Sequence, residues 1–322
     1  MIVVTGGAGF IGSNVVRGLN ERGETDILVV DNLAPHPRLS GPKFLNLANV
    51  RFTDFMDKTE FRRAISKGSL GSPITAILHQ GACSDTLEDD GRYMMDNNFT
   101  YSKELLEFAL SNQIPFVYAS SAAVYGASES FQERSANEHP LNIYGFSKLA
   151  FDNYVRRRVT PSDSPVVGLR YFNVYGPCEQ HKGRMASVIH QLTRQLQQTG
   201  TMKIFEGSGK YGNGEQLRDF VFVGDIVKIN LYFLNVSARH GILNAGTGQS
   251  RSFNDVTNAL KEANGKGTVE YIPFPEGLKQ RYQSFTEADI SCLRAMGYSD
   301  RFTPLLDGVK QMSSSRTTGD PQ

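Results

Sequence analysis

Short runs of β-branched and other apolar residues alternate with longer stretches of periodic apolar positions through the first half of the chain. The short runs predict strands and the longer stretches predict amphipathic helices, because side chains return to one face every second residue in a strand and about every 3.6 residues in a helix. Strands are predicted at residues 2–5, 27–30, 50–52, 74–79, 116–119 and 166–170. This alternation is typical of βαβ units, so we expect an α/β fold with a doubly wound parallel sheet.

Helices are expected between these strands and again in the second half of the chain. Asp57 and Glu60 form the pattern of a helix start and Gly68 that of a helix end, so one helix is expected to run to Lys67. Helices are also predicted at residues 92–110, 142–159, 185–198, 225–234, 253–262 and 287–296, with strands at 220–223 and 269–272.

Composition narrows the class of protein. The chain has 34 Lys and Arg against 33 Asp and Glu, so no overall charge attracts it to nucleic acid or to an anionic membrane. It has no apolar stretch of about 18 residues and no pattern of a secretory leader, from which we expect a cytoplasmic protein. Cys83, Cys178 and Cys292 are widely spaced, as in reducing compartments, and neither the cysteines nor the six histidines predict a metal site.

Glycines gather directly after the first predicted strand, in the motif Gly7-x-Gly9-x-x-Gly12, which Gly6 precedes. Between a strand and a helix, such glycines let the backbone approach a pyrophosphate that faces the helix N-terminus. The motif therefore predicts an NAD or NADP site in a Rossmann-like sheet. Asp31, at the end of the second strand, would bind the ribose of NAD. The neighbouring Asn32, Arg38, Lys43 and Lys58 could instead surround the 2′-phosphate of NADP, so spacing leaves this choice open.

The regular alternation weakens after about residue 171. We expect a Rossmann domain formed by residues 1–171 and about 219–250. A smaller, discontinuous α/β substrate domain would be formed by about 172–218 and 251–312. Residues 313–322 are rich in Ser and Thr and are expected to form a disordered tail.

Tyr144 and Lys148 lie four residues apart on a predicted helix and so share one face. A phenol titrates near pH ~10, and a neighbouring ammonium and a nicotinamide cation would favour the phenolate for acid–base work. Ser121 follows the predicted strand at 116–119 and would reach the same edge of the sheet, where it could polarise a substrate oxygen.

These motifs, with Arg170–Pro177, resemble the extended short-chain dehydrogenase/reductase superfamily through nearly the whole chain, which implies a nucleotide-sugar substrate. Longer strings resemble one family within it, the ADP-L-glycero-D-manno-heptose 6-epimerases. They include residues 81–84, 93–98, 101–106, 181–188, 205–208, and 270–275 leading to 281–283.

The resemblance implies an isomerase that epimerises C6 of ADP-D-glycero-β-D-manno-heptose, with bound NADP and a transient C6 ketone, in the synthesis of lipopolysaccharide inner-core heptose. It implies two acid–base residues, Tyr144 and Lys182, although a loop lysine such as Lys182 would otherwise be read as solvated. Lys148 would orient the cofactor and lower the pKa of the tyrosine. The family also suggests a homo-oligomer, in particular a pentamer.

We expect the cofactor, NADP or NAD, to contact residues near the strand ends: Gly6, Gly9, Phe10, Ile11, Gly12, Asp31, Asn32, Lys43, Lys58, Gln80, Gly81, Ala82, Cys83, Ser84, Asn97, Lys148, Val174 and Lys182. We expect the ADP-heptose to contact Ser121, Asn173, Arg184, Gln191, Phe205, Glu206, Gly207, Ser208, Arg218 and Tyr282. Arg218 suits bidentate recognition of the diphosphate. Three features depart from the family pattern: Arg184 replaces a serine, Gln191 replaces a histidine, and residues 209–216 lengthen a loop.

Two other functions remain open. A UDP-sugar 4-epimerase or a 4,6-dehydratase would use the same scaffold, although a dehydratase would carry acidic residues where this chain has Ala122 and Ala123. A regulator that senses NADP without catalysis would commonly lack Tyr144 or Lys148, and both are present.

Overall fold

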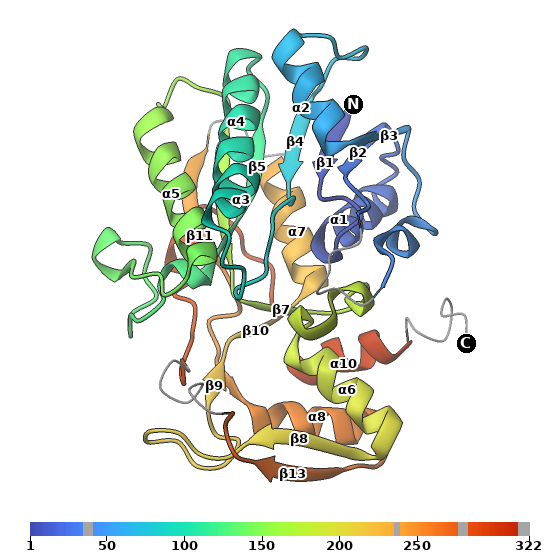
Figure 1. Ribbon diagram of the computed structural model, residues 1–322, viewed down its shortest axis with the longest axis vertical. Helices are drawn as coiled ribbons and strands as arrows, with labels where there is room; N and C mark the ends of the chain where they lie inside the picture. Colours follow the sequence, from blue (N-terminus) through green and yellow to red (C-terminus); the bar gives the residue numbers. More distant parts are fainter. Residues whose placement is uncertain (35–40, 235–238, 276–282, 315–322) are drawn as a thin grey trace.

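A parallel sheet of seven strands forms the centre of the larger part of the molecule (Figure 1). The structure is a computed structural model that describes residues 1–34, 41–234, 239–275 and 283–314. The strand order is β11-β6-β5-β4-β1-β2-β3. The bounds are β1 (Ile2–Thr5), β2 (Ile27–Asp31), β3 (Asp54–Asp57), β4 (Ala76–His79), β5 (Phe116–Ser121), β6 (Val166–Tyr171) and β11 (His240–Ala245). The order reverses between β1 and β4, and a crevice opens at the carboxyl ends of strands at such a point.

Helices cover both faces of this sheet, which explains why its strands read as continuous apolar runs. One face packs on α1 (Phe10–Glu21), α7 (Val223–Leu234) and α9 (Ser291–Ala295). The other packs on α2 (Lys58–Lys67), α4 (Tyr101–Ser111) and α5 (Ile143–Arg158). The expected α/β fold with a doubly wound parallel sheet is thus confirmed.

A smaller part lies beyond the carboxyl ends of the strands, around a separate apolar cluster (Figure 1). It contains the parallel pair β8 (Thr201–Phe205) and β13 (Thr268–Ile272), with α6 (Val188–Thr199), α8 (Phe253–Asn264) and α10 (Leu305–Ser314). There are two further strand pairs among the described residues: β7 (Asn173–Tyr175) with β10 (Phe220–Phe222), and β9 (Leu217–Arg218) with β12 (Arg251–Ser252).

Short helical segments complete the described chain. They are α3 (Gly91–Met95), the π-helical turn η2 (Asp96–Thr100), and the 3₁₀ turns η1 (Lys43–Leu47), η3 (Ala122–Val124), η4 (Ser135–Asn137) and η5 (Gln180–Met185). None of the described helices has the length and apolar character needed to cross a membrane.

Three predicted elements differ from the structure. The strand expected at 50–52 is wrong: β3 begins at Asp54, after Thr53 donates the first ladder hydrogen bond to Ile27 O, at 2.9 Å. The helix expected at 287–296 shortens to α9, because residues before it bond elsewhere; Ala288 N, for example, donates to the Asp219 carboxylate at 3.1 Å. The helix expected at 92–110 is interrupted by η2.

The ends of two further predictions also shift. The helix expected from residue 185 begins at Val188, where Ser187 caps it by accepting a hydrogen bond from His190 N. Ser313 and Ser314, expected in a disordered tail, belong to α10, and the rest of that expected tail lies outside the described residues.

Candidate active site

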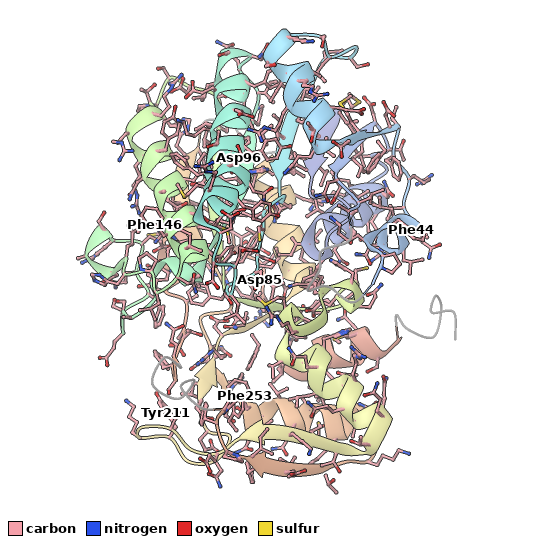
Figure 2. All side chains as sticks on the ribbon, in the orientation of Figure 1. Phe44, Asp85, Asp96, Phe146, Tyr211 and Phe253 are labelled. Carbon is pink, nitrogen blue, oxygen red and sulfur yellow. The ribbon has the colours of Figure 1, made fainter. Side chains whose placement is uncertain are left out.

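A cavity of about 1160 Å³ lies between the carboxyl ends of the large sheet and the smaller part of the molecule. Loops after β1, β2, β4 and β5 line one side, and η5, β8 and α8 contribute to the other. Asp85 lines it from the side of the large sheet and Phe253 from the side of the smaller part (Figure 2). The cavity therefore occupies the position where open α/β sheets bind their ligands.

The glycine loop after β1 is packed too tightly for side chains. Gly6 has a φ of 66°, and a Cβ on it would lie 2.6 Å from Gly81 Cα. A Cβ on Gly12 would lie 2.1 Å from Gly6 O. Gly9 is the N-cap of α1 and has no side chain to cap the first N–H groups of that helix. The loop thus fits the pyrophosphate of a dinucleotide.

Asp31 ends β2 and is held by several donors. Its carboxylate accepts hydrogen bonds from Ala8 N at 3.1 Å and Asn32 N at 2.8 Å, and it pairs with Lys43 Nζ at 2.6 Å. Lys43 Nζ also donates to Asn32 Oδ1 at 2.8 Å. Asp31, Asn32 and Lys43 therefore form one connected group at the end of the cavity expected to bind adenosine. Arg38 lies outside the described residues.

The π-helical turn η2 shapes the wall beside this group. Asn98 is buried there and bonds both the N–H and the carbonyl of Cys83, at 2.8 and 2.9 Å. Asn97 accepts from Lys58 Nζ at 2.6 Å. A π turn adds a residue to a helical turn and often marks a functional site, and here it brings both asparagines to the loop after β4.

Tyr144, Lys148 and Ser121 all line the cavity. The side chain of Asn142 starts α5 by accepting from Gly145 N, which sets the helix register. Burial raises the pKa of Tyr144, and a hydrogen bond with Ser121 opposes that effect. Lys148 Nζ donates to Ala119 O at 2.8 Å, and burial lowers the pKa of Lys148 to about 8.

Lys182 lies on η5 and lines the same cavity. Its Nζ lies 5.1 Å from the centroid of the Phe10 ring, so it is not the solvated loop lysine that the local sequence alone suggests. Burial lowers the pKa of Lys182, and the buried carboxylate of Glu179 opposes this. Gly183, the next residue, has φ 53° and ψ −126°, a conformation that favours glycine and that interrupts the helical turn directly after Lys182.

The cavity wall includes every residue expected to contact the cofactor, and five of those expected to contact the substrate: Ser121, Asn173, Gln191, Phe205 and Arg218. Four others lie off the wall: Arg184, Glu206, Gly207 and Ser208. Tyr282 lies outside the described residues. The roles of all these residues remain predictions.

The departures from the family pattern have structural counterparts. Arg184 is half exposed and pairs with Asp85, a residue of the cavity wall, at 3.6 Å. Gln191 donates to Ala186 O at 2.8 Å. The lengthened loop turns back at an isolated bridge between Ser208 and Tyr211, and Ser208 lies buried at 2.9 Å from Ser284 Oγ.

Sequence reasoning missed several residues of the wall, among them Asp85, Tyr93, Tyr101, His181 and Phe253. Tyr101 is the most informative, because its buried hydroxyl has no hydrogen-bond partner within the described chain. The Lys58 ammonium, which lines the same cavity, lies 5.9 Å from the Tyr101 ring centroid. The spacing of Tyr101 four residues after Asn97 could have revealed it.

Within the described residues, no cluster of His, Cys, Asp and Glu could hold a metal ion. The cavity brings together the parts of a dinucleotide-dependent enzyme: a glycine cradle, a tyrosine–lysine pair on one helix and a serine at a strand end.

Comparisons with known proteins agree with this class. Residues 2–246 match the model of the NAD dependent epimerase/dehydratase family. An ADP-L-glycero-D-manno-heptose-6-epimerase of Alkalilimnicola ehrlichii is 53% identical over 310 residues, which cover 96% of this chain and 95% of that protein.

Solved structures extend the comparison. The ADP-L-glycero-D-manno-heptose-6-epimerase of Helicobacter pylori superposes with a TM-score of 0.85 at 33% identity, over 98% of this chain and 96% of that one. The UDP-glucose 4-epimerase of Thermotoga maritima, solved with UDP-glucose, superposes with a TM-score of 0.78 at 28% identity. The match covers 98% of this chain and 99% of that one. The chain therefore belongs to the NAD dependent epimerase/dehydratase family and, within it, to the family of ADP-L-glycero-D-manno-heptose-6-epimerases.

Proposed function

We propose that this chain inverts C6 of ADP-D-glycero-β-D-manno-heptose to give ADP-L-glycero-β-D-manno-heptose. The observation that carries the proposal is that Tyr144 and Lys182, from different elements, line one cavity with Ser121 and the glycine loop. Inversion through a ketone needs proton transfer at the C6 oxygen in two orientations of the sugar, for which two titratable groups are suited. The relatives named for this reaction support it.

The side chains divide the work as follows. A bound dinucleotide supplies reversible hydride acceptance at C6. Tyr144 exchanges a proton with the C6 oxygen in one orientation. The hydrogen bond from Ser121 opposes the rise that burial gives the pKa of Tyr144, and a nearby ammonium such as that of Lys148 would favour the phenolate. Lys182 exchanges the proton in the other orientation, and burial lowers its pKa, which makes the ammonium a better proton donor.

We propose NADP as the preferred dinucleotide. In NAD-specific sites the acidic residue after β2 is free to accept from the ribose hydroxyls. Here the Asp31 carboxylate already accepts from three backbone N–H groups, those of Ala8, Asn32 and Leu33, and it forms an ion pair with Lys43. Lys58, whose ammonium donates to the neutral Asn97 side chain, then provides positive charge for a 2′-phosphate, and Lys43 Nζ provides a further hydrogen-bond donor. Replacing Lys43 by Met should weaken the binding of NADP more than that of NAD, measured by calorimetry; equal losses for both dinucleotides would contradict the assignment.

The far end of the cavity suits a nucleoside diphosphate. Arg218 is 8% exposed, lines the cavity and has its guanidinium 6.0 Å from the Phe253 ring centroid. Phe205 also lines it and stacks on Phe274 with centroids 4.5 Å apart. Aromatic faces and a buried guanidinium are the groups that bind a base and a diphosphate. We assign the ADP moiety to this end.

The direct test is to incubate the protein with ADP-D-glycero-β-D-manno-heptose and to follow the C6 epimer by NMR. Tyr144→Phe and Lys182→Met should each lower the rate at least a hundredfold and leave the cofactor bound. Lys310→Met, which removes an exposed lysine of α10, is the matched control and should keep full rate. Unchanged heptose would contradict the proposal, and inversion of UDP-glucose at C4 instead would favour the UDP-sugar 4-epimerase alternative.

We also propose, from the family resemblance, that the protein is a cytoplasmic homo-oligomer, in particular a pentamer. Light scattering of the purified protein measures the assembly, and a monomer would contradict it.

A further inference from the structure

A cluster of charged side chains lies buried behind the catalytic helix α5, away from the cavity. Asp152 and Arg170 have no exposed surface, and Glu138 is 9% exposed. Arg170 bonds both carboxylates: its Nε donates to Asp152 at 3.0 Å and its second amino group to Glu138 at 2.6 Å. Arg156 also pairs with Glu138. None of these four side chains lines the cavity, so none has a direct role in the proposed reaction.

Asp152 connects this cluster to the residues that do line the cavity. It lies one helical turn after Lys148 on α5. Its carboxylate accepts from Tyr118 Oη at 3.0 Å and from Ser120 Oγ at 2.9 Å, both on β5. Ser120 immediately precedes Ser121. On its other side, the carbonyl of Ala119 accepts the hydrogen bond from Lys148. A single buried carboxylate thus joins the helix that carries Tyr144 and Lys148 to the strand end that carries Ser121.

We propose that Asp152 is a positioning residue of the active site, which ties α5 to the end of β5 and keeps the ammonium charge on the buried Lys148. The proposal rests on the proposed function, because it assigns Lys148 and Ser121 to that reaction. A carboxylate with three buried donors is costly to displace, so it holds the two elements at one separation.

The charged and titratable groups around Lys148 show why Asp152 matters for its protonation. Burial lowers the pKa of Lys148 to about 8, and Asp152 is the main group that raises it, with a smaller contribution from Cys83 on the loop after β4. His79 on β4 is buried and neutral at physiological pH, since burial lowers its pKa to about 3. Around Asp152 itself lie Tyr118, Arg170, Arg156 and Glu138, and Glu138 remains paired with both arginines when the Asp152 charge is lost.

The test is the pH dependence of kcat/KM for Asp152→Asn. If the reaction needs protonated Lys148, losing the carboxylate should move the alkaline limb to lower pH by about one unit or more. Asp152→Glu keeps the negative charge and should leave the alkaline limb of the pH profile unchanged. It should lower kcat, because the longer side chain disturbs the hydrogen bonds between α5 and β5. Glu138→Gln removes a carboxylate from the same cluster but not from beside Lys148, so it should lower Tm without moving the limb.

A wild-type profile for Asp152→Asn, or an equal shift for Glu138→Gln, would overturn the proposal. If Asp152→Asn does not fold, Ser120→Ala carries the test: it breaks the 2.9 Å hydrogen bond and should lower kcat severalfold at unchanged KM. Wild-type kcat for Ser120→Ala would then overturn it.

A second readout separates this proposal from the proposed function. The rate of acetylation of Lys148 against pH, followed by mass spectrometry, reports its protonation without any substrate. A lower midpoint in Asp152→Asn supports the inference even if the heptose is not converted, and an unchanged midpoint in the folded variant overturns it.

Discussion

Replacing Gly12 by Ala tests whether the glycine cradle is as tight as its geometry indicates. The added methyl group would lie 2.1 Å from Gly6 O and 2.7 Å from Gly6 C, whereas ordinary contacts begin at 3.4 Å. The loop must therefore open by roughly 1 Å. Gly6 N donates to Val30 O at 2.7 Å and Gly6 O accepts from Gly9 N at 2.9 Å, so opening strains both hydrogen bonds. Overpacking of this kind costs about 1–3 kcal/mol.

The expected result is a lower Tm and an affinity for the dinucleotide reduced about fivefold to a hundredfold, since about 1.4 kcal/mol corresponds to tenfold. Calorimetry with NADP and thermal unfolding of the cofactor-free protein measure the two effects. Gly71→Ala is the matched control, because a Cβ there meets nothing within 4 Å and its φ is not in the left-handed region. Unchanged affinity and unchanged Tm in Gly12→Ala would refute the packing argument.

Two further predictions concern stability and substrate binding. His79 is 2% exposed with a pKa of about 3, whereas an unfolded histidine titrates near 6.5. The unfolded chain therefore takes up a proton that the folded chain does not, and the free energy of unfolding should fall by about 2 kcal/mol between pH 6.5 and 5. Denaturation at both pH values should show a smaller fall in His79→Gln, and an equal fall would contradict the assignment. Arg218→Met should raise KM for the ADP-sugar at least tenfold, as expected for a lost charge-assisted hydrogen bond, whereas Arg184→Ser should change it little. If steady-state kinetics instead showed the larger rise in KM for Arg184→Ser, the diphosphate would lie near Arg184.

The elements that could be predicted are those in which local signals agree. Helix α2 spans Lys58–Lys67 as expected, because Asp57 accepts from Thr59 N at its start and Gly68 takes a φ of 62° at its end. Strand β11 was not predicted. Its buried Asn244 bonds distant residues, Tyr125, Phe131 and Asp289 through its side chain and Glu133 through its N–H, and no local pattern reveals these contacts.

In the site, too, the features that local sequence determines could be predicted, and those that depend on distant residues could not. The glycine cradle and the Tyr144–Lys148 pair could be found in the sequence, because each depends on neighbours a few residues away. Lys182 is partly buried against Phe10, which is distant in the chain, and only the family resemblance suggested that this lysine belongs to the site. Arg184 follows the turn at Gly183 and pairs with Asp85, a contact that no spacing predicts.

The fate of the C6 hydrogen tests the central claim most directly. ADP-D-glycero-β-D-manno-heptose carrying deuterium at C6 is converted in ordinary water, and the epimer is analysed by mass spectrometry and NMR. If the hydride leaves and returns within one closed site, the product keeps its deuterium and has inverted C6. An inverted product that has lost deuterium to solvent would show deprotonation at carbon instead, and would contradict the assignment of Tyr144 and Lys182 to the C6 oxygen.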